Sequence, residues 1–171
     1  MTGRVYVALL RAINIGGRTV KMDRLRAIFE EMGLTGVATF IASGNVVFNA
    51  PRGSATRLET RIEAALKASL GFHVDTFVRS TAELATICER EFPPVSVYVG
   101  FLKQAPDAAA VSALRARSTA NDEFDVDDRE VYWTCRTSMG LSNISSSMIE
   151  KLLGMPMTMR NITTVRKLAA W

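Results

Sequence analysis

The sequence predicts an α+β fold made of two ferredoxin-like (β-α-β-β-α-β) subdomains, joined by a helix and followed by a C-terminal helix. Two observations support this prediction. Apolar residues switch repeatedly between a strand-like and a helix-like spacing, and the resulting order of elements occurs twice. Glycine or proline follows most of the expected helices and stops them. The two halves share negligible sequence identity, so only the order of elements is repeated.

The first half is expected to hold four strands and two helices. The run VYVALL is apolar on both faces, which is typical of a buried strand. One helical stripe is formed by Leu25, Ile28, Phe29 and Met32. The segment GVATFIASGNVVFNA predicts a β-hairpin, with Gly44 and Asn45 in a type II′ turn. The expected ranges are 4–10 (strand), 22–32 (helix), 36–50 (hairpin), 54–70 (helix) and 72–80 (strand).

The second half repeats this order after a connecting helix and linker at 81–94, so the expected subdomains are residues 1–80 and 95–171. Ser147 and Glu150 have the spacing of a capping box for a helix that ends at Gly154. Because halves of this size are usually not stable alone, we expect them to form one folding unit. The expected ranges are 95–102 (strand), 106–117 (helix), 123–136 (hairpin), 147–153 (helix), 157–160 (strand) and 161 onward (helix).

The composition indicates a globular protein without a membrane partner. Of the 171 residues, 48% are hydrophobic and 22% are charged, which argues against wholesale disorder. No apolar stretch approaches the roughly 18 residues of a membrane-spanning helix, and the run at residues 5–10 is too short for a signal peptide. A soluble, cytoplasmic protein is therefore expected. Cys88 and Cys135 are expected to be buried free thiols, with a single disulfide between them as the alternative. Nothing in the sequence indicates an oligomeric state.

The connection after the first strand, RAINIGGRTVKM (residues 11–22), is the main candidate site. It is longer than the two to six residues that such loops commonly need. Its glycine pair can adopt positive φ and bring the backbone close to a ligand, and its cations precede a helix N-terminus, which favours anions. Composition alone is equally compatible with a long turn whose charges are solvated. The candidate ligand-binding residues of this loop are Arg11, Asn14, Gly16, Gly17 and Lys21.

Two further segments carry polar groups that could join this loop. SGN lies in the expected hairpin and is explained by turn formation alone, and TMRNITTVRKL can form a second anion clamp or simply begin the last helix. The charge distribution favours an anionic ligand near the two ends of the chain, since residues 1–29 and 131–171 are both strongly basic. The candidate residues of these segments are Ser43, Gly44, Asn45, Arg160, Asn161 and Thr164.

The sequence indicates no metal site and no cofactor. His73 is the only histidine, it lies in an alternating strand pattern, and neither cysteine belongs to a ligand motif. The acidic run from Asp122 to Glu130 predicts a solvated hairpin turn rather than a cation site. For Tyr132 and Trp133, strand alternation predicts one ring in the core and one pointing outward.

The segments LLRAINIGGRTVKMDRLRAIFEEMGL, ATFIASGNVVF and TMRNITTVRKL, in this order and spacing, resemble the bacterial domain-of-unknown-function family numbered 1697. The resemblance covers essentially the whole chain. It implies an α+β fold with two ferredoxin-like subdomains, and it supplies no reaction. The residues that match the family pattern are Arg11, Asn14, Gly16, Gly17, Lys21, Met22, Ser43, Gly44, Asn45, Thr158, Arg160, Asn161 and Thr164.

The chain departs from this family pattern at two places. Ile162 follows the Arg-Asn pair where the family usually has an aromatic residue. The run Ser142-Asn143-Ile144 stands where the family often has Ser-Lys-Leu. A lysine that could contact a ligand in other members is therefore missing from this chain.

The sequence favours a small cytoplasmic protein that binds an anionic or nucleotide-like ligand in one cleft formed by both basic segments. The first alternative is an enzyme acting on a phosphorylated or acylated small molecule, which would be distinguished by a carboxylate or His73 inside the same cleft. The second alternative, an RNA-binding or protein-interaction module, follows from fold analogy alone.

Overall fold

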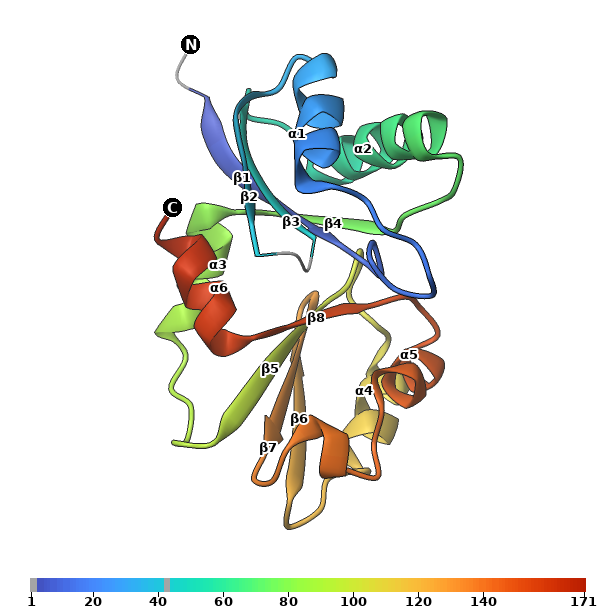
Figure 1. The fold of residues 1–171 in the computed structure, drawn as a ribbon. Coiled ribbons are helices and arrows are strands. Elements are labelled where there is room, and N and C mark those ends of the chain that lie inside the picture. The colour runs from blue at the N-terminus through green and yellow to red at the C-terminus, as the bar shows by residue number, and fades with distance from the viewer. Residues whose placement is uncertain (1–2, 42–43) are drawn as a thin grey trace. The chain divides into compact units, whose positions relative to one another are not determined.

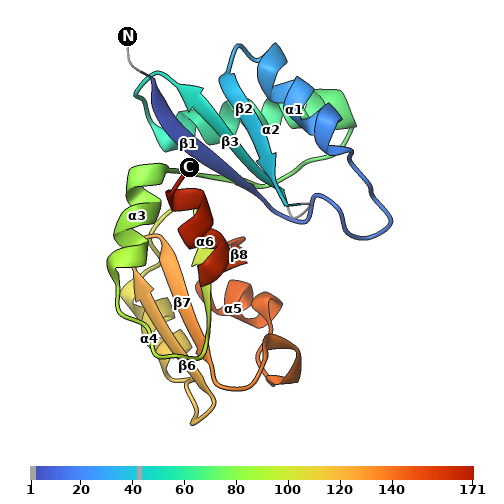
Figure 2. The same ribbon diagram turned by 60° about the vertical axis from the view of Figure 1, so that its left-hand side comes forward.

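The computed structural model describes residues 3–41 and 44–171, which form two compact units (Figures 1 and 2). The first unit runs to Ile87 and also contains Lys167–Trp171, and the second is Cys88–Arg166. Each holds a complete β-α-β-β-α-β series, so the predicted order is confirmed. The boundary between the units passes through the two remaining helices, α3 (Thr81–Glu89) and α6 (Ile162–Ala169). That the halves fold as one unit stays a prediction.

The first unit is a four-stranded antiparallel sheet in the order β2-β3-β1-β4, with α1 and α2 on one face (Figure 1). Of the predicted stripe, Leu25, Ile28 and Phe29 are buried against this face, and Met32 is partly buried beside them. Phe48 joins strand and helix, since its ring centroid lies 5.6 Å from that of Phe29 and 5.9 Å from that of Tyr6. The elements are β1 (Arg4–Leu10), α1 (Met22–Glu31), β2 (Thr35–Phe40), β3 (Asn45–Ala50), α2 (Ala55–Leu70) and β4 (Thr76–Ser80).

The second unit has the matching strand order, β6-β7-β5-β8, with α4 and α5 packed on its core face. Leu114 of α4 and Ile149 of α5 are fully buried in a cluster with Trp133. The β5 strand can pack closely against Met157 of this cluster because residue 100 is glycine. A Cβ at Gly100 would overlap the Met157 side chain. The elements are β5 (Ser96–Phe101), α4 (Ala108–Arg115), β6 (Asp122–Asp127), β7 (Glu130–Cys135), α5 (Ser146–Leu153) and β8 (Thr158–Asn161), with a 3₁₀ turn at Met139–Leu141.

Two local predictions are wrong. Asn45 is the first residue of β3 and pairs with Phe40, so Gly44 and Asn45 are not the centre of a two-residue turn. The predicted capping box also fails, because the cap of α5 is Ser145, two residues before Ser147, and it accepts a hydrogen bond from the Met148 amide. Glu150 instead accepts from the Met157 amide at 2.8 Å. In both places a side chain bonds to a residue that the sequence motif does not include: Asn45 to Phe40, and Glu150 to Met157.

The acidic hairpin is not simply a solvated turn. Asp122 is buried and accepts hydrogen bonds from Trp133 Nε1 at 2.8 Å and Ser142 Oγ at 2.9 Å. Asp125 forms ion pairs with Arg90 and Arg115. These two carboxylates therefore bind the hairpin to the segments that carry Ser142, Arg90 and Arg115. The acidic sequence run did not predict these contacts.

The two neighbouring aromatic residues of β7 are both buried, although alternation places them on opposite faces. Trp133 lies in the core cluster. Tyr132, predicted to be the outward ring if Trp133 is inside, is covered by Phe92 at 5.8 Å between ring centroids and by Arg90, whose guanidinium lies 4.4 Å from the Tyr132 ring. The segment that follows α3 provides this cover.

No helix in residues 3–41 and 44–171 combines the length and apolar character that crossing a bilayer would require.

Candidate functional site

Three segments of the first unit meet at one end of its sheet. β1 lies between β3 and β4 and runs antiparallel to both, so its last residues neighbour the first residues of those strands. The Leu10 amide donates to the Gly44 carbonyl at 2.8 Å, and the Arg11 amide donates to the Asp75 carbonyl at 2.9 Å. The predicted loop thus lies beside the hairpin loop on one side and the start of β4 on the other (Figure 1).

The loop after β1 is held in one conformation by buried side chains and a hydrogen bond within the loop. Ile13 and Val20 are buried and anchor its two arms. Asn14 ties the arms together, because its Oδ1 accepts a hydrogen bond from the Val20 amide at 2.8 Å. Between these anchors the backbone turns through positive φ at Gly16 (68°) and Gly17 (80°), both of which are exposed. In the part of the chain that the structure describes, no hydrogen bond occupies the amides of these two glycines.

Backbone strain gathers at this same end of the sheet. Ala12 has φ of 56° and Ile41 has φ of 50°, a conformation that L-residues rarely adopt and that is unusual for a β-branched side chain. The two residues belong to the loops that follow β1 and β2. Such strain persists only where surrounding contacts enforce it, and it is found preferentially at functional sites.

The loop's cations are held in different ways. The partly exposed guanidinium of Arg11 lies 3.8 Å from Asp75 Oδ2. Arg18 stacks over Phe72, with its guanidinium carbon 4.4 Å from the ring centroid. Lys21 is exposed and holds the position before α1, whose first amides receive no side-chain cap from it. The loop therefore carries positive charge along its length and ends at the uncapped first amides of α1, which also favour an anion.

The hairpin residues play a supporting part in this arrangement. Asn45 is fully buried, and its Nδ2 donates to the Phe40 carbonyl at 3.0 Å. Gly44 has φ of 82° and packs tightly, since a Cβ there would lie 2.8 Å from Ile13 Cγ2. The hairpin thereby fixes the arm of the loop that carries Ile13. Ser43 lies outside the described residues.

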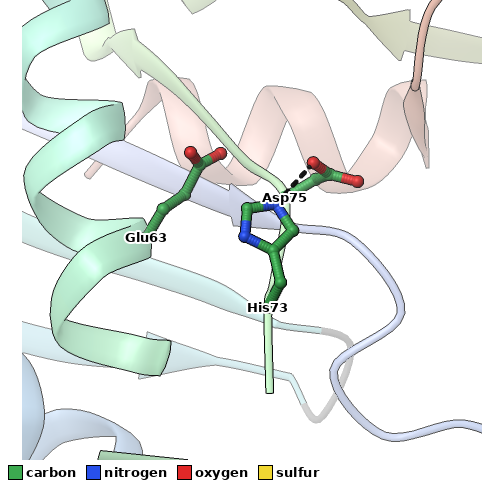
Figure 3. Close-up of side chains that lie close together, drawn as sticks. All are labelled: Glu63, His73 and Asp75. Atoms are coloured by element: carbon green, nitrogen blue, oxygen red, sulfur yellow. Dashed lines mark hydrogen bonds and ion pairs between the residues drawn. The ribbon is translucent and has the colours of Figure 1, made fainter. Parts of the chain in front are cut away.

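A titratable cluster lies next to Arg11, and it was not predicted (Figure 3). Glu63 projects from α2, while His73 and Asp75 precede β4. One possible ligand atom from each residue lies within 4.8 Å of the others, and His73 Nε2 is 2.9 Å from Asp75 Oδ1. The only sequence signal for this cluster is the His-x-Asp spacing of His73 and Asp75. Glu63 could not be predicted from the sequence, because it lies on α2, before the turn at Gly71.

The remaining predicted site residues belong to the second unit. Arg160 is largely buried, and its Nη1 donates to Thr158 Oγ1 and to the Met159 carbonyl, both at 2.8 Å. Burial lowers the pKa of Arg160 to about 10, so the guanidinium keeps its charge at neutral pH. Asn161 Oδ1 accepts from the Thr163 amide at 2.7 Å, which confirms the predicted cap of the last helix. Thr164 is half-buried in that helix. That both basic segments serve one ligand stays a prediction.

The second unit also has a shallow groove of about 610 Å³, next to Asp125 and Tyr132. Burial alone would raise the pKa of Asp125, but hydrogen bonds from Arg115 and Arg90 outweigh it and lower this pKa. The Asp125 carboxylate therefore stays ionised in its ion pairs with Arg90 and Arg115. Burial, with the charge of Glu130 adding to it, raises the pKa of Tyr132 to about 12.

The Tyr132 phenol is expected to ionise only near pH 12. Because the folded state prefers the neutral phenol, this preference stabilises the fold below about pH 10, the ordinary tyrosine pKa, and is lost as the pH rises from about 10 to 12. Absorbance at 295 nm during alkaline titration measures the ionisation. Among the three tyrosines, the component near pH 12 should disappear in Tyr132→Phe. An unchanged titration above pH 11 in that variant would show that another group is responsible.

Comparison with known proteins establishes the family. A family model described as "Protein of unknown function (DUF1697)" matches residues 4–132, which is most of the chain. The chain belongs to the DUF1697 family. The matched range contains the whole loop after β1, the hairpin residues and the Glu63–His73–Asp75 cluster, and it ends before Arg160.

A solved structure of a conserved bacterial protein from Streptococcus pneumoniae is similar to this DUF1697 member over almost the entire length. The match has a TM-score of 0.76 at 21% sequence identity and covers 98% of this chain and 97% of the other. At this identity the likeness concerns the fold. No curated protein matches the chain. Family membership therefore brings the α+β architecture with it, and the activity has to be argued from the site.

Proposed function

We propose that this protein binds a small anionic or nucleotide-like ligand, bearing a phosphate or carboxylate group, at the loop formed by residues 11–21. The observation that carries this proposal is the strain at Ala12 and Ile41, two non-glycine residues at positive φ in neighbouring loops. Their conformations cost of the order of 1–3 kcal/mol each, and strain of this kind is found preferentially at functional sites.

The contacts around the strained residues suit an anion. Gly16 and Gly17 form the centre of a turn that the Arg18 amide closes by donating to the Ile15 carbonyl at 3.4 Å, and the exposed amides of both glycines can donate to an anion. Arg11 and Lys21 stand at the two ends of the loop, and the N-terminal amides of α1 follow directly. Charge-assisted hydrogen bonds of this type contribute about 1.5–3 kcal/mol each.

A thermal-shift screen of inorganic phosphate, nucleotides, sugar phosphates and carboxylates, made in buffers freed of divalent metal by an immobilised chelator, tests this proposal. A ligand present at 100 times its Kd should add about 2.7 kcal/mol of stability. Arg11→Ala should abolish the shift. Arg24→Ala is the matched control, because Arg24 lies on the exposed side of α1 and, within residues 3–41 and 44–171, forms an ion pair only with Glu31. An equal loss in both variants, or no shift from any compound, would contradict specific binding at the loop.

An enzyme acting on a phosphorylated or acylated small molecule is the second candidate. It is favoured by the pairing of His73 with Asp75, which also contacts Arg11. A histidine held by a carboxylate beside an anion-binding arginine has the composition of a general base next to a substrate clamp. Slow turnover of the bound compound, abolished in His73→Ala while binding is retained, would distinguish this function from binding alone.

Nucleic-acid binding remains an alternative that rests on the element order. Filter binding of RNA at low and at physiological salt tests it, since contacts to phosphates weaken steeply as salt rises. If the protein retains RNA on the filter at low salt and Arg11→Ala does not, the ligand of the loop is a polymeric anion rather than a small one.

A further inference from the structure

We propose that Glu63, His73 and Asp75 bind a divalent transition-metal ion with at least one coordination position left open. The three side chains offer one imidazole nitrogen and two carboxylate oxygens, all within 4.8 Å of one another. Figure 3 shows the imidazole of His73 lying between the two carboxylate groups. The inference goes beyond the anion-binding loop because it uses other side chains, although Arg11 contacts Asp75.

The spacing of the atoms is close to that of a coordination sphere. Two ligand atoms bound at about 2.0–2.2 Å to one ion are roughly 3.0–3.5 Å apart. His73 Nε2 and Asp75 Oδ1 are already 2.9 Å apart. A side-chain adjustment of Glu63 of the order of 1 Å would complete a three-ligand face. The hydrogen bond between His73 and Asp75 would then be replaced by two bonds to the metal.

The backbone that carries these side chains is fixed. Glu63 Oε1 accepts a hydrogen bond from the Thr76 amide at 2.9 Å, which joins α2 to β4. The Asp75 carbonyl accepts from the Arg11 amide, and Asp75 Oδ2 faces the Arg11 guanidinium at 3.8 Å. Asp75 can therefore offer Oδ1 to an ion while Oδ2 stays oriented by Arg11. Such outer contacts hold metal ligands in place and tune them.

The donor set selects a class of metal. Imidazole nitrogen suits Zn²⁺ and Fe²⁺, and the two carboxylates also suit Mn²⁺, whereas Mg²⁺ and Ca²⁺ prefer sites made of oxygen alone. Three protein ligands with a further position for water or an exogenous ligand are typical of catalytic rather than structural zinc sites. His73 is exposed, so the ion would be reachable from solvent. A bound divalent ion would also add positive charge next to Arg11.

Calorimetric titration of the full chain tests the site. The protein is freed of affinity tags, dialysed against chelator and titrated with Zn²⁺, Mn²⁺ or Mg²⁺. One saturable equivalent of Zn²⁺ or Mn²⁺ is expected, with a Kd at least about tenfold below that for Mg²⁺. Because the chain has one histidine, the ¹H–¹⁵N signals of its imidazole report on His73 alone and should shift on Zn²⁺ binding.

Variants identify the ligands. His73→Ala and Glu63→Gln should each weaken binding at least about tenfold, and glutamine keeps an oxygen for the Thr76 amide. The control is Asp128→Asn, which removes one carboxylate from the acidic hairpin at an exposed position with φ of 49° that asparagine tolerates. This control should change the Kd less than twofold. Cys88→Ser, made in the same way, should also leave the Kd unchanged.

Three results would overturn the metal site: no saturable binding, His73 signals that do not move at saturation, or an equal loss in Asp128→Asn. Since the anion screen is made in buffers freed of divalent metal, failure of the metal site leaves that result standing, and the reverse also holds.

Discussion

Replacing Glu59 by alanine should lower the free energy of unfolding by about 3–5 kcal/mol. Glu59 on α2 and Arg79 on β4 are almost completely buried, with Glu59 Oε1 4.0 Å from Arg79 Nη1. The same carboxylate oxygen accepts a hydrogen bond from the Val78 amide at 2.9 Å. Alanine would therefore remove both the counter-charge of a buried guanidinium and the acceptor of a buried amide.

Urea unfolding measures this loss, and two variants interpret it. Arg57→Ala, on the exposed side of α2, should change stability by no more than about 0.5 kcal/mol. The double variant Glu59→Gln/Arg79→Met should recover much of the loss, because it removes both buried charges and keeps an oxygen for the Val78 amide. A loss below about 1 kcal/mol for Glu59→Ala would mean that the pair is not buried in solution as the structure describes.

Gly44→Ala should cost about 2–4 kcal/mol and should also abolish the anion response. The glycine has φ of 82°, and a Cβ there would lie 2.8 Å from Ile13 Cγ2, 3.1 Å from Leu10 Cβ and 3.3 Å from the Leu10 carbonyl oxygen. Relief of these contacts has to move the arm of the loop that Ile13 anchors. The substitution thus links the stability of the hairpin to the shape of the candidate site.

Gly71→Ala is the matched control for Gly44→Ala. Gly71 has φ of 80°, nearly the same backbone conformation, and a Cβ there would meet nothing within 4 Å. It should cost only the conformational penalty of about 1–2 kcal/mol and leave the anion response intact. Urea unfolding and the thermal-shift screen applied to both variants separate backbone strain from steric contact. Equal effects in the two variants would refute a role for the contact with Ile13.

The order of elements could be predicted because it depends on local properties. The stripe of Leu25, Ile28 and Phe29 and the apolar run of β1 each identify an element within a few residues of its true bounds. The predicted cap at Asn161 is confirmed for the same reason, since the Thr163 amide it serves is two residues away. The capping box at Ser147 was wrong because the partner of Glu150 is the Met157 amide, beyond the end of the helix.

The candidate site likewise has features that depend on neighbouring residues in the chain and features that depend on tertiary packing. The sequence by itself determined the family, the two α+β units and the polar loop of residues 11–21, all of which depend on residues close together in the chain. Only the tertiary structure decided that Asp75 lies against Arg11 and that Glu63 joins His73, because the pairing of β1 with β4 and the packing of α2 bring them together. It also decided that Asp122 and Asp125 are structural, since their partners lie up to 35 residues away. Periodicity reports which face of an element is apolar, and it carries no information about which distant polar group will meet that element.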